Sequence, residues 1–209
     1  MATLPPLYLI TDRRQVPGGD LLGALDAALA AGVRLVQLRE KDLDARALHD
    51  LARRVKVLAD RHGAGLLVNG RADIALDLGI GVHLPGATPP VAAVRALLGP
   101  RALIGVSTHR LDEVRRAADG GASFVTFGPV FDTPSKRALG APVGTALLAR
   151  AVAAAGPVPV FALGGVRRAR LAELRGTGCH GVALISEVLA APDPGPVAAD
   201  LLAALSTGF

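Results

Sequence analysis

The sequence predicts a single closed (β/α)8 barrel, and three observations lead to this fold class. Short apolar runs alternate along the whole chain with longer segments in which apolar residues recur every three or four positions. About eight such repeats fit into 209 residues, which is near the minimum size of this fold. Strict alternation of strands and helices also requires parallel pairing with right-handed crossovers.

The short apolar runs are the predicted strands of the barrel. A parallel strand that is buried on both faces is expected to be an almost continuous apolar run. The predicted strands are Leu7–Thr11, Leu35–Arg39, Gly65–Asn69, Gly81–Leu84, Ala102–Val106, Phe124–Phe127, Pro159–Leu163 and Val182–Ser186.

The segments between the strands are predicted to be helices. In the first of them Ala24, Ala27, Ala28 and Ala31 show the helical spacing, and Gly32 follows as a typical end of a helix. The predicted helices are Leu21–Ala31, Ala45–His62, Ala72–Leu78, Pro90–Leu98, Leu111–Asp119, Thr145–Ala155, Arg168–Thr177 and Pro196–Ala204.

An open doubly wound sheet is the alternative architecture. It would normally have fewer strands and a G-x-G-x-x-G turn after the first one, whereas the first strand here is followed by Asp12, Arg13 and Arg14. The chain contains no evident linker or low-complexity segment. Residues 1–209 are therefore predicted to form one TIM-barrel domain.

Composition and charge exclude several classes of partner. The net charge is +5, but arginines are scattered through the predicted helices and form no basic run interleaved with aromatic residues, so no nucleic-acid partner is expected. No apolar run approaches the ~18 residues of a membrane span. The sequence leaves both a monomer and a homo-oligomer as alternatives, because an Ala/Leu-rich helix face has the same pattern in a core and in an interface.

The single cysteine and the start of the chain indicate a cytoplasmic protein. Cys179 cannot form an internal disulfide, which is typical of a reducing compartment. The chain begins almost directly with the first apolar strand and shows no basic region followed by a signal-like apolar segment.

Polar residues at the ends of the predicted strands are the candidates for function, because a (β/α)8 barrel carries its site there. Gln37, Arg39 and Lys41 alternate at the end of the second strand, where they could grip an anionic ligand. The alternative is that Glu40 and Lys41 simply begin a solvated loop.

The third, fourth and fifth strands end in polar residues with two interpretations each. Asn69 can bind a ligand or cap the next helix, and His83 can face the mouth or form a structural hydrogen bond. Ser107 and His109 follow the fifth strand, and His109 is the best general acid or base of the chain. The alternative is that Ser107 or Thr108 caps a helix and His109 is exposed.

Phosphate binding is predicted at the ends of the last three strands. Gly164 and Gly165 let a ligand approach the backbone, and the small-residue end of the eighth strand at Ile185 and Ser186 would complete the cradle. The long loop after the sixth strand carries further candidates, namely Thr133, Ser135 and Lys136.

No metal site is predicted. The sequence contains no H-E-x-x-H or C-x-x-C motif, and no pair of carboxylates follows the third and fourth strands, where Mg²⁺ could be held with a diphosphate.

Motifs along nearly the whole chain resemble those of the thiamine-phosphate synthase/TenI superfamily. They occur in the same order in Tyr8–Asp12, Val36–Lys41, Val68–Asn69, Gly81–Leu84, Ile104–His109, Phe127–Lys136, Ala162–Gly165 and Gly181–Ser186. The resemblance implies a phosphate-binding (β/α)8 barrel of thiamine biosynthesis whose substrate is a small phosphorylated thiazole.

Two activities share this scaffold in the superfamily. The synthase joins a hydroxymethylpyrimidine diphosphate to a thiazole phosphate and releases diphosphate with Mg²⁺. The TenI-type thiazole tautomerase aromatises a thiazole phosphate carboxylate without a metal, using a histidine as acid and base.

Two departures from the synthase pattern favour the tautomerase. Gly70 and Thr88 stand where the synthase has Mg²⁺-binding aspartates, and His109 falls where the tautomerase has its catalytic histidine. The expected enzyme is therefore a thiazole tautomerase that needs no cofactor. The alternatives are a Mg²⁺-dependent thiamine-phosphate synthase and a non-catalytic phosphate-binding or regulatory barrel.

Overall fold

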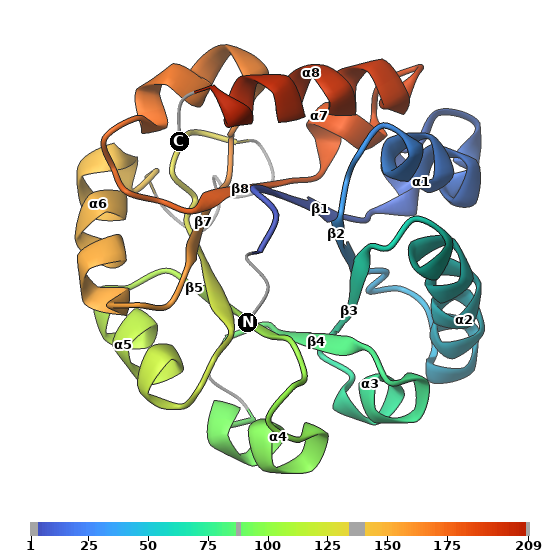
Figure 1. The fold of residues 1–209 in the computed structure, drawn as a ribbon, viewed down its shortest axis with the longest axis horizontal. Helices are drawn as coiled ribbons and strands as arrows, with labels where there is room; N and C mark the ends of the chain where they lie inside the picture. The colour runs from blue at the N-terminus through green and yellow to red at the C-terminus, as the bar shows by residue number, and fades with distance from the viewer. Residues whose placement is uncertain (1–3, 87–88, 134–140, 208–209) are drawn as a thin grey trace.

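The computed structural model describes residues 4–86, 89–133 and 141–207, and these form a closed barrel of parallel strands (Figure 1). The strands pair in chain order from β1 to β8. The barrel closes where β8 returns to β1 through the pairs Leu7↔Val182, Tyr8↔Ala183 and Leu9↔Leu184. The predicted (β/α)8 fold class is confirmed.

The eight strands line the centre of the molecule and the helices surround them (Figure 1). The strands are β1 (Leu7–Ile10), β2 (Leu35–Leu38), β3 (Gly65–Asn69), β4 (Gly81–Leu84), β5 (Ile104–Thr108), β6 (Phe124–Phe127), β7 (Val160–Leu163) and β8 (Gly181–Leu184). The helices include α1 (Leu21–Ala30), α2 (Ala45–Arg61), α3 (Ala72–Leu78), α4 (Val91–Leu98), α5 (Leu111–Asp119), α6 (Gly144–Ala155), α7 (Ser186–Leu189) and α8 (Pro194–Ser206).

Short 3-10 helices complete the layer outside the barrel. They are η1 (Arg13–Gln15), η2 (Pro17–Gly19) and η4 (Arg168–Leu174). The segment η4 was expected to be an α-helix extending to Thr177, but it ends earlier. Gly176 and Gly178, both with positive φ, follow it and turn the chain toward β8.

Five of the eight strands differ from their predicted bounds, and the carboxyl ends of β5 and β8, each shifted by two residues, lie at the candidate site. β5 begins at Ile104 rather than Ala102, because the Ala102 carbonyl accepts a hydrogen bond from the Arg95 guanidinium; the strand then continues through Ser107 and Thr108. β8 ends at Leu184, and Ser186 begins the short helix α7, which the sequence did not predict.

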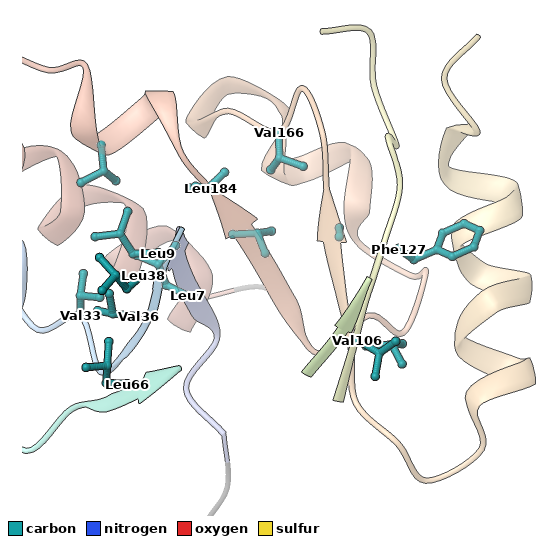
Figure 2. Close-up of a cluster of buried hydrophobic side chains, with 14 of the residues drawn as sticks. Leu7, Leu9, Val33, Val36, Leu38, Leu66, Val106, Phe127, Val166 and Leu184 are labelled. Carbon is teal, nitrogen blue, oxygen red and sulfur yellow. The ribbon is translucent and has the colours of Figure 1, made fainter. Parts of the chain in front are cut away.

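The alternation of each strand separates two apolar clusters. Leu7 and Leu9 of β1 point outward and pack in the cluster shared with the helices, part of which Figure 2 shows. Tyr8 and Ile10 point inward and pack in a smaller cluster inside the barrel. Burying one leucine or valine contributes roughly 1.5–3 kcal/mol, so both faces of each strand stabilise the fold.

Polar side chains replace apolar ones toward the carboxyl ends of the strands. Gln37 and His83 are buried there, and Asn69 and Ser107 are partly buried. This polar layer closes the interior apolar cluster and forms the floor of a cavity at that end. In the part of the chain that is described, no helix combines the length and the apolar character needed to cross a bilayer.

Candidate active site

A cavity of about 600 Å³ lies at the carboxyl ends of the strands. Residues from every part of the barrel line it. Those predicted from the sequence that line it are Gln37, Arg39, Lys41, Asn69, Ser107, His109, Thr133, Gly164, Gly165, Ile185 and Ser186. Ser135 and Lys136 lie outside the described residues. The structure therefore brings the predicted residues that it describes together around one cavity.

One side of the cavity is basic. Arg39 and Lys41 flank Glu40 after β2, and the Arg39 guanidinium is half-buried. Within the described residues, the guanidinium of Arg39 forms no hydrogen bond or ion pair. Burial lowers the pKa of Arg39, although an arginine stays charged at neutral pH. A half-buried cation of this kind is suited to an anionic ligand.

Glu40 lies on the other side of the chain from the cavity. It is 4% exposed and accepts hydrogen bonds from the Thr11 hydroxyl at 2.6 Å and from the Arg13 backbone N–H at 3.1 Å. The idea that Glu40 begins a solvated loop is therefore wrong, because its carboxylate is held in the interior by β1 and the segment after it.

The floor of the cavity is a chain of hydrogen bonds between four strands. The Gln37 amide nitrogen lies 3.0 Å from the Tyr8 hydroxyl, and that hydroxyl lies 3.2 Å from Nδ1 of His83. Nε2 of His83 lies 2.9 Å from the Ser107 hydroxyl. Gln37, His83 and Ser107 line the cavity, whereas Tyr8 lies beneath them.

The ionisable groups of this floor are neutral. Burial, with a smaller contribution from the Arg39 charge, lowers the pKa of His83 to about 3. Burial also raises the pKa of Tyr8 well above its usual value. At neutral pH the floor therefore presents hydrogen-bonding groups without charge, next to the basic side formed by Arg39 and Lys41.

His109 follows β5 at the rim of the cavity. Its Nδ1 contacts the backbone carbonyl of Gly128, which can only accept, so Nδ1 carries the proton and Nε2 is left as an acceptor. Its backbone N–H donates to the Glu113 carboxylate at 2.7 Å. A histidine with a fixed tautomer is suited to accepting a proton from a ligand.

The alternative in which Ser107 or Thr108 caps a helix is wrong, but its second part is confirmed, because His109 is exposed. Helix α5 begins after Arg110, and the Thr108 hydroxyl donates to the backbone carbonyl of Thr126 at 2.9 Å instead. Ser107 bonds to His83 of the adjacent strand β4. Both hydroxyls are thus held by neighbouring strands, because β5 is two residues longer at this end than the sequence suggested.

The glycine side of the cavity is formed by the segments after β7 and β8. Gly164 and Gly165 have φ angles of +94° and +63°. A Cβ at Gly164 would lie 2.6 Å from the Cα of Pro129, and one at Gly165 would lie 2.5 Å from the carbonyl oxygen of Asp132. Both glycines therefore permit close packing of the segment after β6, in addition to lining the cavity.

Ser186 completes this side from the start of α7. Its hydroxyl donates a hydrogen bond of 2.6 Å to the side-chain oxygen of Gln15 in η1. This contact ties the end of the barrel's last strand to the segment after its first strand, and it fixes the position of Ser186 at the cavity.

The segment after β3 supplies no carboxylate for a magnesium ion, and the acidic residues that line the cavity are Asp132 and Glu187. After β3 the chain continues with Gly70, whose φ is +69°, and the next acid, Asp73, is paired with Arg71. No group of three or more His, Cys, Asp or Glu residues with metal-binding geometry occurs within the described ranges. Thr88 lies outside those ranges.

Tyr8 is a functional candidate that the sequence pattern did not indicate. Its contact with His83 spans 75 residues of sequence, so only the closed barrel brings the two together. The available signal was a phenol at an inward-facing position of an otherwise aliphatic strand, since a buried tyrosine hydroxyl normally has a partner.

Comparison with known proteins identifies the family. The model of the family TMP-TENI, described as thiamine monophosphate synthase, matches residues 7–188. The chain belongs to this family. The match covers all eight strands, so the TMP-TENI motifs lie on the elements that form the cavity.

Relatives of this TMP-TENI protein match it over nearly the full chain. A Geobacter sulfurreducens protein, named provisionally as a thiamine-phosphate synthase, is 54% identical over 95% of this chain and 93% of its own. The thiamine-phosphate synthase of Salinispora arenicola is 44% identical over 99% of this chain and 100% of its own. These names favour the synthase over the tautomerase that the sequence analysis expected.

A solved structure of a related protein has the same fold. The thiamine phosphate pyrophosphorylase of Pyrococcus furiosus superposes with a TM-score of 0.84 at 29% identity, covering 96% of this chain and 95% of that one. A role of this TMP-TENI protein in thiamine biosynthesis is thus supported by sequence and by fold.

Proposed function

We propose that the protein is a thiamine-phosphate synthase, which joins a hydroxymethylpyrimidine diphosphate to a thiazole phosphate and releases diphosphate. The observation that carries this proposal is the half-buried guanidinium of Arg39, which has no hydrogen-bond or ion-pair partner among the described residues and faces the same cavity as the glycine side. A reaction between two phosphorylated substrates needs two anion-binding regions in one cavity. The names of the relatives support the same reaction.

Each side of the cavity has its own role in this proposal. Arg39 and Lys41 bind the diphosphate, and backbone N–H groups at Gly164 and Gly165, together with Ser186, bind the phosphate of the thiazole. The neutral floor at Gln37, Asn69 and Ser107 orients the rings between the two anions. Ser135 and Lys136 stay predicted contributors from outside the described residues.

The chemical step forms one bond and breaks another. The thiazole nitrogen supplies the electron pair for the new bond to the methylene carbon of the pyrimidine, and the bond from that carbon to the diphosphate oxygen breaks. The electron pair leaves with the diphosphate. Arg39 and Lys41 offset the charge that develops on this leaving group, and such fixed cations lower the barrier of a step that separates charge.

Magnesium would assist the same leaving group in a typical synthase, but the described residues hold no group of three or more His, Cys, Asp or Glu side chains that could bind it without the diphosphate. No step of the proposal is therefore assigned to a metal ion. The proposal instead places the stabilisation of the diphosphate on the basic side of the cavity.

The test is an assay of the purified protein with both substrates, with and without EDTA. The expected result is release of diphosphate together with formation of thiamine phosphate. The release should require both substrates, because the thiazole nitrogen supplies the electron pair of the step. Diphosphate release without thiamine phosphate, or no reaction with saturating substrates, would contradict the proposal.

A thiazole tautomerase is the second candidate, because of one specific geometry. His109 has its Nδ1 proton held by the Gly128 carbonyl, which leaves Nε2 as a base at the rim of the cavity. The discriminating assay offers a thiazole phosphate carboxylate tautomer and follows its aromatisation. Turnover that persists in EDTA and is lost in His109→Gln would favour this candidate, whereas turnover only with the two synthase substrates would exclude it.

A further inference from the structure

We propose that Tyr8 is a positioning residue of this cavity, which fixes the hydrogen-bonding direction of Gln37 directly and that of Ser107 through His83. The inference rests on the proposed function only in taking this cavity as the substrate site. It concerns which atoms of the floor donate and which accept, and it applies to either candidate reaction.

The four side chains come from four strands and meet inside the barrel. Tyr8 of β1 has no exposed surface, His83 of β4 is 2% exposed, and Gln37 of β2 is 1% exposed. Tyr8 lies between the Gln37 amide nitrogen at 3.0 Å and Nδ1 of His83 at 3.2 Å. The chain of contacts thus begins and ends at the cavity but passes beneath its surface.

The direction of these hydrogen bonds follows from the first contact. The amide nitrogen of Gln37 can only donate, so the Tyr8 oxygen accepts from it. The phenolic proton is then available for Nδ1 of His83, which must be unprotonated to accept it. The remaining proton of the neutral imidazole lies on Nε2 and is donated to the Ser107 oxygen.

The two ends of the chain are fixed as a consequence. Ser107 accepts from His83, so its own proton is free to be donated to a ligand in the cavity. Gln37 uses its amide nitrogen toward Tyr8, so its carbonyl oxygen is left as an acceptor at the cavity. With the proton on Nδ1 instead, Ser107 would donate to Nε2, and the Tyr8 proton would have an acceptor only if the Gln37 amide turned its oxygen toward it.

The surroundings of Tyr8 keep this arrangement in place. Its ring packs edge-to-face on Phe124 with centroids 5.1 Å apart and also contacts Phe161 at 5.8 Å. The Arg39 charge and burial both disfavour a protonated His83, which would have to donate from both nitrogens. The hydrogen bonds of the floor are therefore held in one of the two possible donor-to-acceptor directions.

The first test measures the His83 tautomer directly and needs no turnover. Nitrogen-15 NMR of the imidazole in the wild-type protein is expected to show a neutral ring with its proton on Nε2. In Tyr8→Phe, which keeps the aromatic ring but removes the donor to Nδ1, the tautomer should shift or become mixed. A proton on Nδ1 in the wild type would overturn the proposal.

The second test separates positioning from stability. Tyr8→Phe is expected to lower kcat/KM by roughly tenfold or more, since it leaves two buried polar groups without their partner. In a double-mutant cycle with Ser107→Ala the two losses should be far from additive, because Tyr8 acts through Ser107. Fully additive losses would overturn the proposal.

Phe161→Leu is the control for a merely structural effect. It disturbs the same aromatic cluster but removes no hydrogen bond, so it should lower stability without moving the His83 tautomer. If the protein shows no synthase turnover, the proposed function fails while the tautomer measurement still decides the present inference.

Discussion

The hydroxyl of Thr11 donates a 2.6 Å hydrogen bond to the buried carboxylate of Glu40, and this contact joins the segments that follow β1 and β2. The same hydroxyl oxygen accepts a bond of 2.9 Å from the Arg39 backbone N–H. Glu40 is therefore the anchor that fixes the chain between Arg39 and Lys41, the two cations on the basic side of the cavity.

Glu40→Gln should weaken this anchor. The amide keeps the shape of the side chain but turns one acceptor into a donor, which would face donors of Thr11 and Arg13. We expect a loss of about 1–3 kcal/mol in the free energy of unfolding, measured by urea denaturation, together with a higher KM for the diphosphate substrate. Glu173→Gln is the control, because Glu173 is exposed and pairs only at the surface with Arg170. Equal losses in the two variants would contradict the anchoring role.

Arg39→Met should impair binding of the diphosphate substrate. Methionine retains much of the apolar stem and removes the half-buried charge, so we expect kcat/KM to fall by roughly a hundredfold or more with little change in stability. Arg53→Met removes an exposed charge on α2, away from the cavity, and should leave the kinetics unchanged. Steady-state kinetics with the diphosphate as the varied substrate checks this, and matching values for both variants would argue against the basic side as the diphosphate site.

Gly165→Ala should disrupt the glycine side of the cavity. The added methyl would lie 2.5 Å from the Asp132 carbonyl oxygen, in addition to the strain of a φ of +63°. Gly18→Ala has a similar φ of +73° but meets nothing within 4 Å, so it isolates the strain from the clash. We expect Gly165→Ala to lose several-fold more thiazole phosphate affinity and more thermal stability than Gly18→Ala. Similar behaviour of the two variants would show that the close approach is unimportant.

Stability should fall in mild acid because of His83. Its pKa of about 3 in the folded protein is below the value of about 6.5 in the unfolded chain, so the unfolded chain binds the proton first. The contribution of His83 is therefore complete above pH 6.5 and decreases as the pH falls, by about 1.4 kcal/mol per unit. Urea denaturation at pH 7 and pH 5 should show a loss of roughly 2 kcal/mol that is largely absent in His83→Gln. An equal loss in the variant would assign the acid sensitivity to other groups.

Thr126→Val should be neutral or stabilising by up to about 1 kcal/mol. Among the described residues, the Thr126 hydroxyl is the buried side-chain polar atom without a hydrogen-bond partner. Thr108→Val is the matched control, because the Thr108 hydroxyl is equally buried but donates to the Thr126 carbonyl at 2.9 Å. Thermal denaturation should rank the Thr126 variant above the Thr108 variant, and the reverse order would contradict this account.

The local sequence pattern was sufficient to predict the barrel, but it did not predict every strand end at the cavity. The apolar runs located all eight strands, because buried parallel strands tolerate few polar residues. Ser107 was placed beyond β5, since a hydroxyl after an apolar run has the same pattern as a helix cap. The strand continues through Ser107, which pairs with Thr126 of β6 and contacts His83 of the neighbouring strand β4, and sequence spacing reveals neither contact.

The family motifs predicted the position of the cavity better than they predicted the reaction. Gly70, read as a missing metal ligand, favoured a tautomerase, while the relatives favour a synthase. Tyr8 and Glu40 show the limit of residue-by-residue reasoning in another way. Both act through side chains that are distant in sequence, Tyr8 on His83 and Glu40 on Thr11, so their importance depends on strand register rather than on local pattern.

The aromatic composition makes Tyr8 a natural fluorescence probe of the barrel interior. The chain has one tyrosine and no tryptophan, so the fluorescence excited at wavelengths that phenylalanine does not absorb originates from Tyr8. That single phenol is fully buried between Gln37 and His83 at the floor of the cavity. Changes in emission on adding a ligand therefore report on this one hydrogen-bonded position, without any label and without contributions from the helices outside.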